Sequence, residues 1–196
     1  MGYGLSVFRV PEPMLARVCG KNDQALLNDA LKALEDALQN YDKQMDAPDL
    51  ENNDVDISHA DALREIFSGK FTQGVNGARY GWAFECLCRF IGEGLSNVGF
   101  VPCRVAWYEE LDKVMVDNQI PLKFTNLIYR SPVRIPQSDD WPCVGHWGAN
   151  ELAALGPLAE LIPRINDFEM QESLTTALGW LQKIAKDPGL IIGFHG

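Results

Sequence analysis

Long apolar runs and positive charge are both scarce in this sequence. No apolar stretch approaches the roughly 20 residues that a helix needs to cross a membrane, and the run LIIGF at residues 190–194 is short. Seventeen basic residues stand against 27 acidic ones, which gives a formal net charge of −10. Nucleic acids and anionic membranes are bound by neutralising phosphate groups, so this balance disfavours both as direct partners. It favours solubility or attraction to a basic partner.

The first residues also lack the features of an export signal. The stretch MGYGLSVFRV has no basic start and no long apolar segment before a cleavage site. Five cysteines, an odd number, then favour reduced thiols in a cytoplasmic protein over a disulfide framework. With 46% apolar residues, the chain is expected to form a single domain over residues 1–196.

Hydrophobic periodicity predicts more helices than strands. Helices are expected over residues 22–41, from Ser58 to Gly69, over 78–95, over about 107–117, from Asn150 to a break at Gly156-Pro157, and from a capping box at Asn166 and Glu169. Strands are expected over residues 3–10 and 122–130 and in LIIGF. This order predicts an α+β or α/β fold whose small sheet contains both terminal strands.

Residues 42–57, DKQMDAPDLENNDVDI, form an acidic stretch with little periodicity and are predicted to be a loop. Six acids there face one lysine. Asn52, Asp54 and Asp56 alternate as in an EF-hand loop, but Ile57 replaces the turn glycine and the closing glutamate is missing. The stretch therefore predicts no calcium site.

The most chemically loaded stretch is SDDWPCVGHWG, residues 138–148. Cys143 and His146 have workable spacing for zinc, but a structural site needs four ligands and no second pair is present. Cys143 and His146 are also poorly placed as a nucleophile and its base, because two residues three apart in a turn rarely point toward each other. The favoured interpretation is a turn anchored by its two tryptophans. The alternative is a small-molecule binder or enzyme whose pocket contains Asp139, Asp140, Trp141 and His146.

The remaining thiols do not suggest a metal site. Cys86 and Cys88 lie two residues apart on an expected helix and therefore point about 200° away from each other. Such thiols behave as small buried hydrophobes. The sequence predicts neither a bound metal nor a cofactor.

The chain as a whole resembles an uncharacterised bacterial family. The resemblance rests on YGLSV near the start, AFECLCRFIG, DDWPCVGHWGANEL and the closing GLIIGF, which occur in the same order in that family. The final two-thirds are also distantly similar to YfbM-like proteins, in which a loop leads into a helix beginning like ANELAAL. No activity or catalytic residue carries over from either group. Because such small acidic proteins often occur beside secreted bacterial toxins, the resemblance implies an immunity role.

The sequence favours a binding protein over an enzyme, because it shows no coherent catalytic set. The expected partner is a protein, a basic toxin domain such as a nuclease, bound without direct contact to nucleic acid or membrane. Its positive cleft would meet the acidic residues 42–61, which hold seven carboxylates and one lysine. The predicted partner-binding residues there are Asp49, Glu51, Asp54 and Asp56.

Overall fold

The computed structural model describes residues 4–44, 55–138 and 141–196. The chain divides into two compact units. The first, called the sheet unit here, comprises residues 1–10, 94–132 and 144–196. The second, called the helical unit, comprises residues 11–93 and 133–143. The interpretation as a single domain stays a prediction, since compactness of the parts does not decide whether they fold independently.

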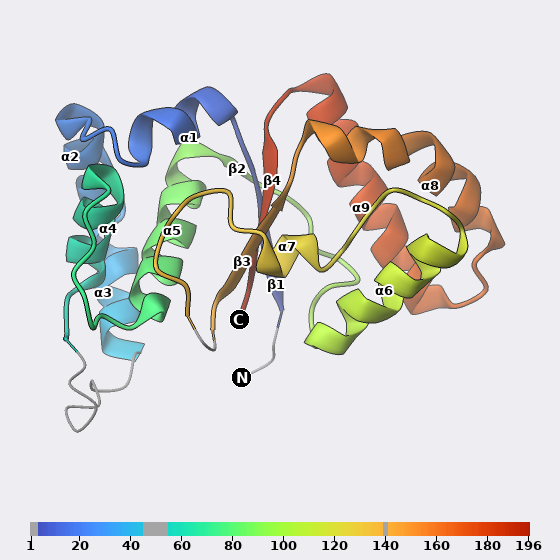
Figure 1. Cartoon of the computed structure of the whole chain (residues 1–196), viewed down its shortest axis with the longest axis horizontal. Coiled ribbons are helices and arrows are strands. Elements are labelled where there is room, and N and C mark those ends of the chain that lie inside the picture. The colour runs from blue at the N-terminus through green and yellow to red at the C-terminus, as the bar shows by residue number, and fades with distance from the viewer. Residues whose placement is uncertain (1–3, 45–54, 139–140) are drawn as a thin grey trace. The chain divides into compact units, whose positions relative to one another are not determined.

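A four-stranded sheet with strand order β2-β1-β4-β3 contains both terminal strands, as predicted. β1 (Leu5–Val10) pairs antiparallel with β4 (Leu190–His195), in a register that sets Leu5 opposite His195 (Figure 1). The outer strands are β2 (Glu93–Gly94) and β3 (Cys143–Trp147). β4 is almost wholly buried, as its continuous apolar sequence indicates. The fold class is therefore α+β.

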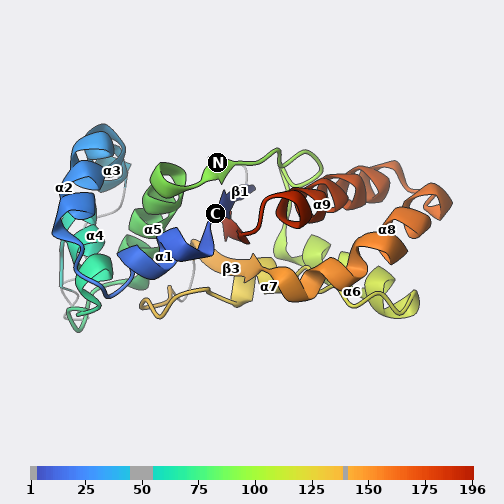
Figure 2. The same ribbon diagram turned by 90° about the horizontal axis from the view of Figure 1, so that it is seen from above.

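The helices of the sheet unit are α6 (Val105–Asp117), α7 (Asn126–Tyr129), α8 (Leu155–Leu161) and α9 (Phe168–Lys186), with short 3₁₀ segments at Ala149–Ala154 and Ile162–Arg164. α8 packs against α9 (Figure 2). The core of this unit is aromatic: the ring of Phe100 lies 5.0 Å from Trp180 and 5.9 Å from Tyr108, and Trp147 is fully buried.

The helices of the helical unit are α1 (Glu12–Val18), α2 (Gln24–Ala33), α3 (Glu35–Gln44), α4 (His59–Ser68) and α5 (Gly77–Ile91). α4 packs against α5 and α3 (Figure 2). The expected ends of α4 are confirmed, because the Ser58 side chain accepts from Asp61 N and Gly69 takes a left-handed φ of 70°. Most residues of α5 are buried.

Several predicted boundaries were wrong near the start of the chain. The helix expected over residues 22–41 is two helices, which meet at Leu34 with φ −106° and ψ 3°. Leucines at helical spacing continue across the break because both helices bury the same side, and no glycine or proline marks it. α3 also runs through Gln44 into the expected loop.

The strand expected over residues 122–130 is instead the short helix α7. The carboxylate of Asp112, on α6, accepts bonds from Phe124 N and from both N and Oγ1 of Thr125, with the Thr125 hydroxyl at 2.6 Å. These contacts fix the backbone where α7 begins. A propensity argument over residues 122–130 cannot include a carboxylate that lies ten or more residues earlier in the chain.

Other corrections concern the second half of the chain. The turn expected within residues 138–148 contains strand β3 in its second part. Pro157 does not break a helix, because α8 begins at Leu155 and the proline falls in its first turn, where no backbone N–H is required. The N-cap of α9 is Asp167 and not the predicted Asn166. The Asp167 side chain accepts a hydrogen bond from Met170 N at 2.9 Å.

Candidate functional site

A buried arginine holds together charged groups from three separate segments of the helical unit. Arg79, near the start of α5, is 8% exposed. Its Nη1 donates to Asp42 Oδ1 at 3.0 Å and its Nη2 donates to Asp56 Oδ1 at 2.7 Å. Asp42 Oδ1 also accepts from the backbone N of His59 at 2.9 Å. Asp42, Asp56, His59 and Arg79 are called the Arg79 cluster below.

Packing of the helices explains how these four residues meet. Asp42 lies in the last turn of α3, and His59 is the first residue of α4. Asp56 lies just before the Ser58 cap of α4. Because α3 and α4 both pack against α5, the two ends of the acidic segment 42–57 lie at one guanidinium group.

The imidazole of His59 is completely buried beside this carboxylate. Its Nδ1 lies 2.6 Å from Asp42 Oδ1, so the neutral ring carries its proton on Nδ1 and donates it to the carboxylate. Nε2 is then a bare acceptor, with no hydrogen-bond donor among the described residues. Burial lowers the pKa of His59, and this effect outweighs the hydrogen bond to Asp42, which raises the pKa.

His59 and a second buried histidine, His195 of β4, should make the protein less stable in mild acid. Burial lowers the pKa of both below the ordinary 6.5, so the unfolded chain binds protons that the folded chain does not. As pH falls through about 6.5, the free energy of unfolding is expected to fall, by at most about 1.4 kcal/mol per pH unit for each histidine. The loss levels off below the folded-state pKa.

Urea denaturation at a series of pH values from 8 to 5 measures this slope. The variants His59→Gln and His195→Gln should each reduce it, because glutamine does not titrate. Hydrogen bonds from Ser58 to Asp61 and from Thr72 to Glu65 lower the pKa of these two carboxyl groups. Their protonation therefore destabilises the folded protein only at more acidic pH. If the slope near pH 6 persists in the double variant, the two histidines are not its source.

Aromatic rings and a second buried acid adjoin the Arg79 cluster. The Tyr41 ring lies 5.7 Å from the ring of His59 and stacks on Trp82 at 5.1 Å. The Tyr41 hydroxyl lies 3.4 Å from Glu85 Oε2, and Glu85 is 2% exposed. Arg89 Nη2 lies 3.4 Å from the other carboxylate oxygen of Glu85. α5 therefore carries a second arginine–carboxylate pair.

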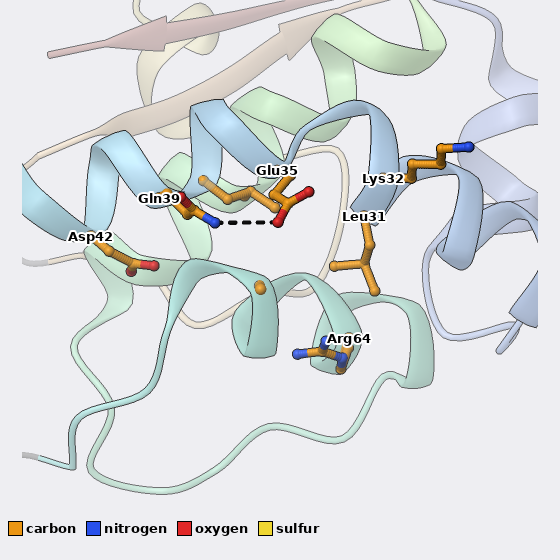
Figure 3. Close-up of a pocket in the computed structure, with 8 residues that line it drawn as sticks. Leu31, Lys32, Glu35, Gln39, Asp42 and Arg64 are labelled. Atoms are coloured by element: carbon orange, nitrogen blue, oxygen red, sulfur yellow. Dashed lines mark hydrogen bonds between the residues drawn. The ribbon is translucent and has the colours of Figure 1, made fainter.

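A groove of about 370 Å³ lies beside Asp42, between α3 and α4 (Figure 3). Along α3, Gln39 Nε2 reaches Glu35 Oε1 at 3.4 Å, and Asp42 follows on the same helix (Figure 3). Lys32 and Arg64 also line the groove, so its positive and negative side chains balance. The groove alone does not select a charged ligand.

The chemistry that the Arg79 cluster supports is structural and electrostatic. An Asp–His pair can orient an imidazole for acid–base work, but Nε2 of His59 is buried where a substrate atom does not reach it in this arrangement. Asp42 and Asp56 hold the guanidinium between two carboxylates. The cluster therefore anchors both ends of the acidic segment on the helical unit.

The predicted partner-binding residues fall partly within this cluster. Asp56 is one of its members, with its side chain 53% exposed. Asp49, Glu51 and Asp54 lie outside the described residues. Because Asp56 is paired with Arg79, a change there removes an internal ion pair as well as a surface charge.

The described residues include only part of the alternative pocket, which therefore stays a prediction. Asp139 and Asp140 lie outside them. Trp141 is half-buried in the helical unit, whereas His146 lies on β3 in the sheet unit, where its Nδ1 donates to Arg130 O at 2.5 Å. Trp147 is fully buried and donates to Lys123 O at 2.9 Å, as expected of a residue that anchors this stretch.

Sequence reasoning missed both Arg79 and His59. One signal was available for Arg79: a charged residue inside a helix that is otherwise mostly apolar must be paired when buried. Cys86 and Cys88, on the same helix, are both fully buried, which confirms that they act as core residues.

The described part of the chain lacks two kinds of feature. No three metal-ligating side chains come together there. No helix there combines the length and apolar character that crossing a membrane requires.

Comparison with known proteins identifies a family for this chain. Searches of curated proteins and of solved structures found no significant similarity. A family model described as a domain of unknown function, DUF7691, matches residues 1–195, which confirms the expected resemblance to an uncharacterised family. Since the match covers nearly the whole sequence, the chain belongs to the DUF7691 family.

Proposed function

We propose that this protein binds and neutralises a basic protein, an immunity-type role toward a bacterial toxin domain, through the acidic surface of its helical unit. One observation carries the proposal, namely where the charge lies. The helical unit has 17 acidic and 9 basic residues, a balance of −8. The sheet unit has 10 acidic and 8 basic residues, a balance of −2. Most of the net charge of −10 thus lies in one compact unit.

The Arg79 cluster supports the choice of surface. Asp42 and Asp56 are both paired with Arg79, whereas the only basic residue in the sequence between them is Lys43. Both ends of the segment are fixed at one point, which reduces the conformational freedom that binding must remove. In the sequence, the intervening carboxylates belong to the more acidic unit.

The partner's chemistry follows from this charge. A toxin that acts on nucleic acid must present a positive surface to phosphate groups. An acidic protein can cover that surface, and complementary charge speeds association above the roughly 10⁵–10⁶ M⁻¹s⁻¹ expected without steering. We place the interaction in the cytoplasm, where a toxin of this class meets its substrate.

Association kinetics with the toxin-like product of a neighbouring gene provide the test. The triple variant Asp49→Asn, Glu51→Gln, Asp54→Asn removes three charges and leaves Asp56 paired with Arg79. We expect its association rate to fall by about tenfold or more at low salt, with a weaker dependence on salt. Stopped-flow fluorescence measures both quantities.

A control variant removes the same charge from the sheet unit. Glu109, Asp117 and Glu160 are exposed and have no side-chain partner among the described residues. Their conversion to Gln, Asn and Gln should change the rate less than twofold. If the partner forms no complex and its toxicity is unaffected, the proposed function is wrong. If a complex forms and both triple variants associate at the wild-type rate, the surface is wrong.

A further inference from the structure

The sheet unit contains an open cavity that the proposed function does not use. It has a volume of about 830 Å³ and lies between the loop of residues 99–104, the first turns of α6 and the start of α9. Figure 1 shows α6 and α9, the two helices that border it. Its apolar wall consists of Val101, Pro102, Ala106 and Trp107.

The cavity is held open by bonds between its walls. Trp107 Nε1 donates to Ser173 Oγ at 3.1 Å, and Ser173 Oγ donates to Gly99 O at 2.8 Å. Gly99 has a φ of +82°, and a Cβ at this position would lie 2.8 Å from Ser173 N. Only glycine therefore allows the loop to lie this close to α9. The aromatic wall is thus preformed.

The polar rim of the cavity is acidic. Glu110, Glu169 and Glu172 line it against a single cation, Arg104. None of these four side chains has a hydrogen bond or ion pair with another described residue. Glu169 lies in the first turn of α9, where it also stabilises the helix dipole. Glu110 is in mid-helix and Glu172 lies beyond the first turn, so the dipole does not account for them.

Exposed apolar side chains adjoin these carboxylates. Val101 is 57% exposed, and Phe168, the residue before Glu169, is 74% exposed. Large apolar side chains in contact with solvent beside unpaired charges are typical of a surface that binds another protein. A tryptophan in a pocket is a common energetic centre of such surfaces.

We propose that this cavity binds a segment of a partner protein in which a Lys or Arg side chain neighbours a large apolar side chain. The apolar group lies against Trp107 and Val101, and the cation meets the three glutamates. The charge of the rim, three carboxylates to one guanidinium, selects a basic segment over an acidic one. The site belongs to the sheet unit and is independent of the proposed binding by the acidic segment.

The test uses the full chain and a labelled probe hexapeptide, Gly-Leu-Arg-Phe-Arg-Gly. An acidic counterpart carries Glu in place of both arginines. Fluorescence anisotropy should show saturable binding of the basic probe with a Kd on the order of 10⁻⁴ M, as expected for a small interface. Binding of the acidic counterpart should be at least tenfold weaker.

Variants then locate the probe. Combined Glu110→Gln, Glu169→Gln and Glu172→Gln changes should weaken binding at least fivefold and reduce its salt dependence. Val101→Ser, at an exposed position, should also weaken it without unfolding the chain. Glu160→Gln and Asp117→Asn, which remove charge from the same unit outside the cavity, should leave Kd within twofold of the wild-type value.

Three results would overturn the proposal. One is the absence of saturable binding, and another is equal affinity for the acidic peptide. The third is complete competition by spermidine at the probe's own Kd, because that would make the cavity a small-cation site. The variants separate this proposal from binding by the acidic segment, since all the residues that they change lie in the sheet unit.

Discussion

Replacing Arg79 with leucine is expected to lower the free energy of unfolding by about 3 kcal/mol. The substitution leaves the carboxylate of Asp42 next to the fully buried His59 without its cation, and it releases Asp56. This loss of unfolding free energy is at the lower end of the range for breaking a buried ion pair. The reason is that the side chains of Asp42 and Asp56 are 30% and 53% exposed. Arg79→Lys should give an intermediate value, since one ammonium cannot form the same fork to two carboxylates. Urea denaturation at pH 7.5 measures all three proteins.

Arg64→Leu is the matched control for this prediction. Arg64 forms an ion pair with Asp61 at 2.7 Å on the surface of α4, and both side chains are 52% exposed. Loss of such an exposed pair should cost less than about 1 kcal/mol. Equal destabilisation by the two leucine substitutions would show that the Arg79 cluster is no more important to stability than a surface ion pair.

Gly145→Ala is expected to destabilise the sheet unit by about 3 kcal/mol or more, or to prevent its folding. A Cβ on Gly145 would lie 2.0 Å from Asn126 O and 2.3 Å from Leu127 C. Both are backbone atoms of α7, so no side-chain rotation relieves the clash. Loss of the near-ultraviolet circular dichroism signal, to which the buried Trp147 contributes, should accompany the drop in denaturation midpoint.

The same substitution at Gly179 should have the opposite effect. Gly179 lies within α9, and a Cβ there would have no atom within 4 Å apart from the neighbouring backbone of its own helix. Alanine is the better helix former there, so Gly179→Ala should stabilise the protein by about 0.5–1 kcal/mol. Wild-type stability in Gly145→Ala would mean that β3 does not pack as closely on α7 as the structure shows.

Sequence reasoning succeeded where a segment's structure depends on its own residues. The strand Leu5–Val10, expected over residues 3–10, and the buried run LIIGF were predicted from apolar patterns alone. Ser58 and Gly69 marked both ends of α4. It failed where a distant group decides the conformation. α7 begins where Asp112 binds the backbone, and β3 depends on Gly145 fitting against α7. Neither dependence leaves a local pattern.

The candidate site was accessible to sequence reasoning only in part. The acidic composition of residues 42–57 was evident, and it led to the proposed binding surface. The Arg79 cluster was not, because Asp42, His59 and Arg79 belong to three helices that meet only through packing. A buried charge can be suspected from an apolar helix that contains it, but its partners cannot be identified without the fold.

The antiparallel pairing of β1 with β4 also has a consequence for synthesis of the chain on the ribosome. Leu5 lies opposite His195 in this pair. β1 therefore leaves the ribosome long before β4, the strand with which it pairs, has been synthesised. The helices from α1 to α5 lie between residues 12 and 91 and can pack much earlier. Long-range pairing of this kind is slow and leaves an apolar strand exposed in the nascent chain. Chaperones that bind extended apolar segments should therefore contact β1 until β4 has left the ribosome.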